Sequence, residues 1–249
     1  MTATGRSPAQ EWCRRAERLA VLCGAGLSVA SGVPTFRGPA GLWRQYRPEE
    51  LASPTAFARD PLLVWQWYAQ RQQAIARCRP NAGHRALAQA LAAGRRLAVL
   101  TQNVDGLQQR ACAAAGVEAD DQIEELHGCL WRLRCTACGA RRMLSTALQI
   151  DTPEDLPRCA SCGGLERPAV VWFGEGLDQR LFERAIAAAR ASTVFIIAGT
   201  SGVVEPAASL ARLCAGHVIE INPEPTPLSA IAEVSIRGGC EQFLPELFG

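Results

Sequence analysis

The sequence predicts an α/β protein with a parallel sheet, into which a small cysteine-containing module is inserted. Two observations support this fold class. Short apolar runs alternate with helical patterns along the 249 residues, which is the order expected when helices cover a parallel sheet. Between residues 128 and 168 the helical periodicity stops, and two C-x-x-C pairs appear among turn residues. The composition, 48% hydrophobic and 20% charged, is that of an ordinary globular chain.

The first strand is expected at residues 19–23, where an apolar run ends in Gly24-Ala25-Gly26. Further apolar runs predict strands at 97–100, 194–198, 217–221 and 234–236. Helical periodicity lies between the strands, at 61–78, 84–93 and 180–191. We expect a main domain formed by residues 1–35, 79–127 and 169–249, an insert at 36–78 with a mobile cofactor loop and helices, and a separate module at 128–168. The part of the chain from 34 to 48 is the part expected to be mobile.

Charge and composition exclude several classes of function. The formal net charge of +2 is too small to indicate a nucleic-acid or membrane surface. All 26 basic residues are arginine, so the chain has neither a Schiff-base lysine for pyridoxal phosphate nor the lysine of a phosphate-binding P-loop. No apolar run approaches the ~18 residues of a membrane-spanning helix. The first twelve residues are polar, so we expect a cytoplasmic protein with no membrane partner.

Four of the eleven cysteines carry the clearest chemical signal. They form two C-x-x-C pairs separated by 20 residues: Cys135 with Cys138, and Cys159 with Cys162. Four thiolates on two tight turns can hold one Zn²⁺ ion in a closed tetrahedron, which leaves no position for water or substrate. We therefore expect a structural zinc ion and look for the reaction elsewhere. A zinc ribbon that binds nucleic acid is the alternative, and it would use Arg132, Arg134, Arg141 and Arg142, although such charges are more often a solvated face.

The glycine turn after the first strand is a weaker signal. A strand that ends in Gly24-Ala25-Gly26 lets the backbone approach a pyrophosphate group, as in dinucleotide-binding domains. The third glycine of that fingerprint is missing, since Val29 stands in its place, and no clear ribose-binding acid follows. On this turn alone, a tight structural turn is about as good an interpretation as a cofactor site.

Several motifs, taken together and in order, resemble the signatures of the sirtuins, which are NAD-dependent protein lysine deacylases. Residues 24–38 (GAGLSVASGVPTFRG) resemble the first signature, and residues 101–107 (TQNVDGL) resemble the second. Leu126-His127-Gly128 resembles the segment that carries the catalytic histidine. Residues 167–175 resemble the peptide-binding strand, 199–201 a cofactor turn and 221–223 the adenosine-ribose site. The resemblance covers about residues 19–240; one departure is Gln108, where many bacterial relatives carry histidine.

This resemblance implies a Rossmann-like NAD-binding domain, an inserted zinc-ribbon module, and substrates that enter between them. It implies that the acyl oxygen attacks the nicotinamide-bearing ribose carbon of NAD, and that His127 then takes a proton from a ribose hydroxyl. The catalytic residues are expected to be His127, Asn103 and Asp105. NAD is expected to contact Gly24, Ala25, Gly26, Ser28, Phe36, Arg37, Trp43, Gln102, Asn103, Asp105, Gly199, Thr200, Ser201, Asn222, Pro223, Glu224 and Cys240. The acyl-lysine substrate is expected to contact Val171, Trp172, Phe173 and Gly174.

A helix rich in aromatic residues adds a hypothesis about the acyl group. Tyr68 and Arg71 are three residues apart and lie on one helical face. The pair resembles the Tyr-x-x-Arg element by which one sirtuin class admits acidic acyl groups such as succinyl or malonyl. The alternative is an amphipathic helix with its aromatic residues in the core and Arg71 in water. The remaining histidines, His84 and His217, are expected to have structural roles.

We therefore expect an NAD-dependent lysine deacylase that releases nicotinamide and O-acyl-ADP-ribose. Two alternatives remain open: a mono-ADP-ribosyltransferase that uses the same NAD site, and a non-enzymatic regulator that binds NAD or nucleic acid. The combination of His127, Asn103 and Asp105 argues against the regulator. The expected partners are acylated lysines of other proteins, with no nucleic acid, and we expect a monomer.

Overall fold

A computed structural model describes residues 7–34, 48–118 and 121–249. Its main feature is a six-stranded sheet in the order β3-β2-β1-β7-β8-β9, in which every neighbouring pair is parallel. The strands are β1 Leu19–Cys23, β2 Leu97–Thr101, β3 Ile123–Glu125, β7 Val194–Ala198, β8 His217–Ile221 and β9 Val234–Ile236. Both faces of β1 and β7 are buried, which explains why these strands read as continuous apolar runs.

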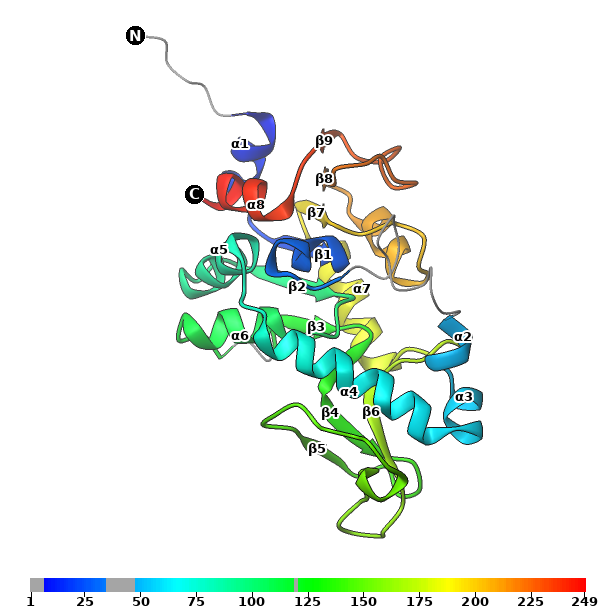
Figure 1. Ribbon diagram of the computed structural model, residues 1–249. Coiled ribbons are helices and arrows are strands. Elements are labelled where there is room, and N and C mark those ends of the chain that lie inside the picture. The colour runs from blue at the N-terminus through cyan, green and yellow to red at the C-terminus, as the bar shows by residue number, and fades with distance from the viewer. Residues whose placement is uncertain (1–6, 35–47, 119–120) are drawn as a thin grey trace.

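Helices cover both faces of this sheet. Leu19 and Val21 point to one face, where they pack with residues of four helices: α1 Pro8–Arg15, α5 Ala82–Ala92, α6 Leu107–Ala114 and α8 Cys240–Phe248. Ala20 and Leu22 point to the other face and pack with α7 Gln179–Ala191 and the 3₁₀ helix η4 Ala207–Leu213. Figure 1 shows α1 and α8, near the two ends of the chain, at the same end of the molecule.

A second, three-stranded antiparallel sheet lies at the opposite end of the molecule (Figure 1), with strand order β5-β4-β6. Its strands are β4 Gly128–Cys135, β5 Arg141–Met143 and β6 Glu166–Val170, and the 3₁₀ helix η3 Pro153–Asp155 lies in the connection between β5 and β6. The expected zinc ligands belong to this part of the chain. The structure thus confirms an α/β fold with a parallel sheet and a small inserted module, while the domain boundaries stay a prediction.

A long helix packs against the small module. The segment after the 3₁₀ helix η1 Ala25–Ser31 contains the helices α2 Pro48–Leu51, α3 Pro54–Arg59 and α4 Pro61–Arg77. On α4, the buried indole N–H of Trp65 donates to the carbonyl of Glu166 in β6 at 2.8 Å. The buried amide of Gln72 donates to the carbonyl of Leu130 in β4 and accepts from the N–H of Leu148. These bonds satisfy backbone groups of the small module and fix α4 against it.

Most predicted elements are confirmed, with small differences at their ends. The strands at 19–23, 194–198, 217–221 and 234–236 match, and β2 extends one residue further than predicted. The three-residue strand β3 was not predicted, because it is too short for a periodic signal. Helix α1 was also not predicted, although the reciprocal capping box between Ser7 and Gln10 is a recognisable start signal. The loop expected to be mobile, at 34–48, lies largely outside the described residues.

None of the described helices is long and apolar enough to cross a membrane.

Gly199 lies where the turn after β7 contacts the turn after β1. Gly199 has a φ of +62°, and a Cβ atom there would lie 2.6 Å from the backbone nitrogen of Leu27. We predict that Gly199→Ala lowers the free energy of unfolding by roughly 3 kcal/mol or more, because strain at positive φ adds to a collision with backbone. The matched control is Gly94→Ala, where φ is +74° but nothing lies within 4 Å. It should cost only the strain, about 1–2 kcal/mol. Urea unfolding of both variants checks the difference, and equal losses would contradict it.

Candidate active site

The turns after four parallel strands converge on one cleft at the carboxyl edge of the large sheet, the usual ligand position in such folds. The cleft has a volume of about 1210 Å³. The expected NAD contacts that line it are Gly24, Ala25, Gly26, Gln102, Asn103, Gly199, Thr200, Ser201, Asn222, Pro223, Glu224 and Cys240. The expected catalytic base and substrate contacts that line it are His127, Tyr68, Arg71, Val171, Trp172, Phe173 and Gly174. Residues that are more than 200 positions apart in the sequence therefore meet in one cavity.

Two expected site residues, Ser28 and Asp105, are not among the lining residues. They are buried next to the cleft, and the Ser28 hydroxyl donates its hydrogen to Asp105 Oδ2 at 2.7 Å. The expected contacts of Ser28 and Asp105 with the cofactor stay a prediction, and in this structure the two side chains are hydrogen-bonded to each other. Phe36, Arg37 and Trp43 lie outside the described residues.

A buried hydrogen-bond network connects these side chains to the cleft. His84 Nδ1 accepts from the backbone N–H of Asn81 at 3.3 Å, so its neutral ring carries the proton on Nε2 and can donate to Ser28 Oγ, 3.3 Å away. Burial lowers the pKa of His84 to about 4, which keeps the ring neutral. Ser28 Oγ also accepts from the amide of Asn103. His84 was expected to be structural; its place in this network was missed, and the sequence contains no signal for it.

Asp105 is the charged centre of the network. Burial raises the pKa of its carboxyl group, while the N–H of Leu107 and the hydroxyl of Ser28 oppose this by donating to the ionised form. The Asn103 amide donates to Ser28 and to the carbonyl of Gly24 at 3.0 Å. Both amide hydrogens are thereby used, so Asn103 has only its Oδ1 atom available to accept a hydrogen bond from a ligand.

His127 has the geometry of a general base. Its Nδ1 lies 3.1 Å from the backbone carbonyl of Gln102, which can only accept. Nδ1 therefore carries the proton, and Nε2 is the basic nitrogen of the neutral ring. Burial lowers the pKa of His127 below its ordinary value of 6.5, and the bond to Gln102 opposes this only in part. The ring is therefore in its basic form at neutral pH.

The glycines of the first turn are required by a contact between two backbone segments. A Cβ atom at Gly24 would lie 2.6 Å from Thr200 Cα, and one at Gly26 would lie 2.7 Å from Gly199 Cα. The N–H of Gly26 donates to the carbonyl of Gly199 at 2.7 Å. The cleft at this end is therefore bounded by peptide backbone of two turns. This reason for the two glycines differs from the close approach of a pyrophosphate that the sequence pattern suggested.

Side chains close the neighbouring end of the cleft. The amide of Gln102 donates to Thr200 Oγ1 at 2.9 Å, and the amide of Asn222 donates to the carbonyl of Thr200 at 2.7 Å. Glu220, whose carboxylate is fully buried, accepts from the hydroxyls of Thr226 and Ser229. These bonds hold the loop at 223–229, part of which lines the cleft. Glu220 was not predicted, although a charged residue inside an apolar strand pattern is a usable signal.

Aromatic side chains and one arginine form the wall opposite the large sheet. The indole N–H of Trp172 donates to the hydroxyl oxygen of Tyr68 at 2.8 Å. The Arg71 guanidinium lies 4.9 Å from the centre of the Trp67 ring. Burial raises the pKa of Tyr68 to about 12 and lowers the pKa of Arg71 to about 10. At neutral pH the tyrosine therefore keeps its hydrogen and the arginine keeps its charge.

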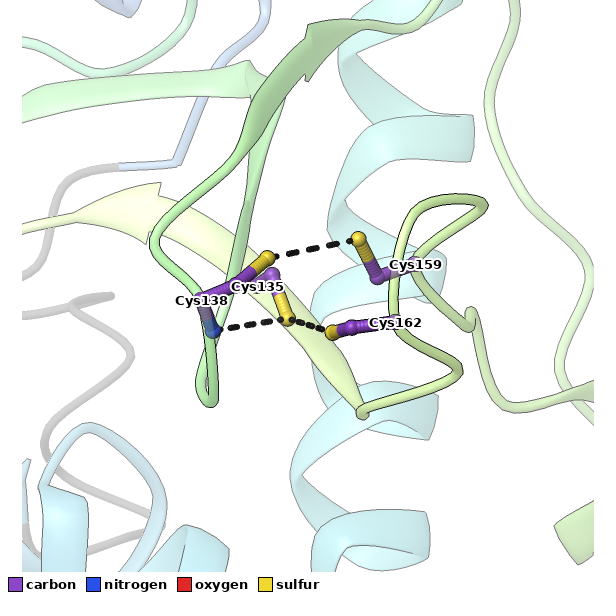
Figure 2. Close-up of side chains that lie close together, drawn as sticks. All are labelled: Cys135, Cys138, Cys159 and Cys162. Atoms are coloured by element: carbon purple, nitrogen blue, oxygen red, sulfur yellow. Dashed lines mark hydrogen bonds between the residues drawn. The ribbon is translucent and has the colours of Figure 1, made fainter.

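The four expected zinc ligands lie together, as Figure 2 shows. Cys135 and Cys138 come from the turn between β4 and β5, and Cys159 and Cys162 from the turn before β6. Their Sγ atoms all lie within 4.8 Å of one another, with Cys135 and Cys162 3.5 Å apart and Cys138 and Cys159 3.7 Å apart. Tetrahedral zinc with Zn–S bonds of ~2.3 Å requires sulfur atoms about 3.8 Å apart.

The surroundings of these sulfur atoms also suit a metal. The backbone N–H of Cys138 lowers the pKa of Cys135 to about 6, assisted by the N–H of Ala137. Thiolates are the form that binds metal. The four cysteines thus fit a structural zinc site, as expected.

Comparison with known proteins identifies the family. A model described as the Sir2 family matches residues 24–206. The chain is 50% identical over 230 residues to NAD-dependent protein deacylase 2 of Pyrobaculum aerophilum, covering 91% of this chain and 88% of that one. It is 46% identical over 233 residues to NAD-dependent protein deacylase of Aquifex aeolicus, covering 92% and 93%. The chain belongs to the Sir2 family.

Solved structures agree with this assignment. A mutant Sir2 homologue in complex with ADP-ribose superposes with a TM-score of 0.90 at 43% identity, covering 98% of this chain and 95% of that one. A Sir2 homologue in complex with NAD has a TM-score of 0.88 at 42% identity, covering 99% and 95%. A Sir2 mutant with a deacetylated p53 peptide and 3′-O-acetyl ADP-ribose has a TM-score of 0.84 at 29% identity, covering 96% and 95%. The fold expectation is therefore confirmed.

The cysteine site gives a direct prediction. Cys135→Ser should lose stoichiometric zinc and lower the melting temperature, because zinc binding in small sites contributes ~10–16 kcal/mol that is coupled to folding. Metal analysis and thermal melts check this. The matched control is Cys214→Ser, a half-buried cysteine outside the module, which should keep its zinc. Full zinc content in the Cys135 variant would contradict the four-thiolate site.

Proposed function

We propose that the protein removes acyl groups from lysine side chains of other proteins in an NAD-dependent reaction that releases nicotinamide and O-acyl-ADP-ribose. The observation that carries this proposal is the joint presence of His127, Asn103 and Gln102 in the cleft of a Sir2 family fold. Relatives that are 43–50% identical are named NAD-dependent protein deacylases. Because the sequence contains no lysine, the acylated side chain must belong to another protein.

The residues of the cleft have distinct tasks in this reaction. NAD supplies the electrophilic ribose carbon and the ribose hydroxyl that later accepts the acyl group. His127 takes a proton from that hydroxyl at Nε2, because its Nδ1 proton is held by the Gln102 carbonyl. Asn103 presents Oδ1, which suits the N–H of the nicotinamide carboxamide. Asp105, which is not among the lining residues of the cleft, acts as a positioning residue through Ser28, whose hydroxyl also accepts from Asn103.

Peptide N–H groups are suited to bind the pyrophosphate. Among the described residues that line the cleft, Arg71 is the only arginine, and it belongs to the aromatic wall beside Tyr68. The turns after β1 and β7 are in direct backbone contact, in which the N–H groups of Gly24 and Gly26 donate to the carbonyls of Ala198 and Gly199, so the proposed donors are the other N–H groups of these turns. Such concave backbone turns favour anions through their N–H dipoles.

Acetyl-lysine and lysines that carry an acidic acyl group are the proposed substrates. An acetyl group needs only an apolar wall. A succinyl or malonyl group brings a carboxylate into the cleft, and its desolvation must be offset by fixed donors. Arg71 offers a charged planar fork and Tyr68 a hydroxyl, and both line the cleft at the aromatic wall.

The first test concerns the base. His127→Ala should reduce kcat/KM for deacylation by about two to four orders of magnitude, the usual share of a positioned general base, while NAD binding persists. In the wild type, kcat/KM should fall on acidification only below pH 6.5, because burial lowers the pKa of the base. This acid limb should disappear in the variant.

The control for this test is His217→Ala, at a half-exposed histidine that pairs with Glu233 away from the cleft. Its rate and pH profile should match the wild type. Near-normal turnover of His127→Ala, measured as release of deacylated peptide, would remove His127 from its role.

The second test concerns the acyl group. Arg71→Met should lower kcat/KM for a succinyl peptide at least 30-fold, because an unpaired buried charge typically costs ~2–5 kcal/mol, or about 30-fold to several thousand-fold. Deacetylation of the matched acetyl peptide should change little, since no carboxylate loses its partner. Tyr68→Phe should show the same asymmetry more weakly.

The control is Arg77→Met, on the exposed last turn of the same helix and outside the cleft. It should leave both substrates unaffected. An equal loss on both substrates in Arg71→Met would mean that Arg71 only supports the helix, whereas transfer of label from NAD to protein would favour ADP-ribosylation.

A further inference from the structure

Trp172 contacts both Tyr68 of the aromatic wall and the ion pair of Arg167 with Glu175. Its side chain is almost fully buried, and its indole N–H lies 2.8 Å from the Tyr68 hydroxyl oxygen. An indole nitrogen can only donate. The oxygen of Tyr68 must therefore accept from Trp172, and the hydroxyl hydrogen must point in another direction.

The direction of that hydrogen determines what Tyr68 can do for a substrate. Burial keeps the hydroxyl protonated, since it raises the pKa of Tyr68 to about 12. A tyrosine hydroxyl has one hydrogen and can rotate about one bond. Because its oxygen already accepts a hydrogen bond from Trp172, Tyr68 meets a substrate as a hydrogen-bond donor, through its hydroxyl hydrogen.

Trp172 is itself held in place on two sides. The Arg167 guanidinium carbon lies 3.3 Å from the centre of the indole ring, and Arg167 is only 4% exposed. The backbone N–H of Trp172 donates to Glu175 Oε2 at 2.9 Å. Arg167 and Glu175 are joined by two hydrogen bonds of 2.6 and 2.9 Å. The ring face and the backbone of Trp172 are therefore fixed by the same ion pair, between the buried Arg167 and the partly buried Glu175.

Arg167 does not receive the acyl carboxylate itself. Besides Glu175, its guanidinium donates to the carbonyls of Pro168 and Val170. Four of its five hydrogens are committed to the protein, and Arg167 is not among the residues that line the cleft. Arg167 therefore acts on the acyl group through Trp172.

We propose that Trp172, fixed by the Arg167–Glu175 pair, is a positioning residue that sets the acyl preference by orienting the Tyr68 hydroxyl as a donor toward an acidic acyl chain. This inference rests on the proposed function. Its specific content is that the indole N–H of Trp172, rather than its ring alone, contributes to the preference for a carboxylate.

The test measures the ratio of kcat/KM for matched succinyl and acetyl peptides. Trp172→Phe keeps an aromatic ring under Arg167 and removes the N–H donor. The ratio should fall about 2- to 12-fold, the share of one hydrogen bond between neutral groups. In Tyr68→Phe the oxygen is gone, so adding Trp172→Phe to it should produce no further fall in the ratio. An unchanged ratio in Trp172→Phe, additive effects in the double variant, or a wild type without succinyl turnover would each overturn the inference.

The matched control is Trp65→Phe, which also removes a buried indole N–H but whose partner is the Glu166 carbonyl in the small module. It should destabilise the protein without moving the ratio. If Trp172→Phe fails to fold, replacing Trp172 with β-(3-benzothienyl)alanine, which keeps the two-ring shape but has no N–H donor, must lower the ratio to the same extent. Failure of the wild type to deacylate either peptide with NAD would refute the proposed function, whereas an unchanged ratio in a working enzyme refutes only this inference.

Discussion

The site depends on a contact between two pieces of backbone. The turn after β1 lies so close to the turn after β7 that no side chain fits at Gly24, Gly26 or Gly199. Hydrogen bonds from the N–H groups of Gly24 and Gly26 to the carbonyls of Ala198 and Gly199 close the contact. Because these turns follow neighbouring parallel strands, their contact places one end of the cleft where the sheet ends. The wall of the cleft there is peptide backbone, which costs no side-chain entropy to hold in place.

A buried carboxylate organises the next layer. Asp105 would be costly in a low-dielectric interior, but donors from Ser28 and Leu107 stabilise its ionised form. The same Ser28 hydroxyl accepts from Asn103 and lies beside the neutral His84 ring. This arrangement gives Asn103 a single orientation in the cleft. The side chain of Asn103 is therefore positioned by groups that do not themselves line the cleft.

Helix α4 contributes to the aromatic wall of the cleft and is also hydrogen-bonded to the small module. One face of this helix brings Tyr68 and Arg71 to the cleft, while Trp65 and Gln72 bond to backbone carbonyls of the small module. The module in turn holds Trp172 through the segment after β6.

The sequence by itself determined the elements whose signals are local. Buried parallel strands are continuous apolar runs, so 19–23 and 194–198 could be predicted, and the two C-x-x-C pairs revealed their tetrahedral site through their spacing. Only the tertiary structure placed His84 next to Ser28, 56 residues away, and Trp172 on Tyr68, 104 residues away. The physical reason is that hydrogen-bond partners are chosen by the packing of separate elements. A sequence pattern records which face of an element is buried, but not which donor on another element that face will meet.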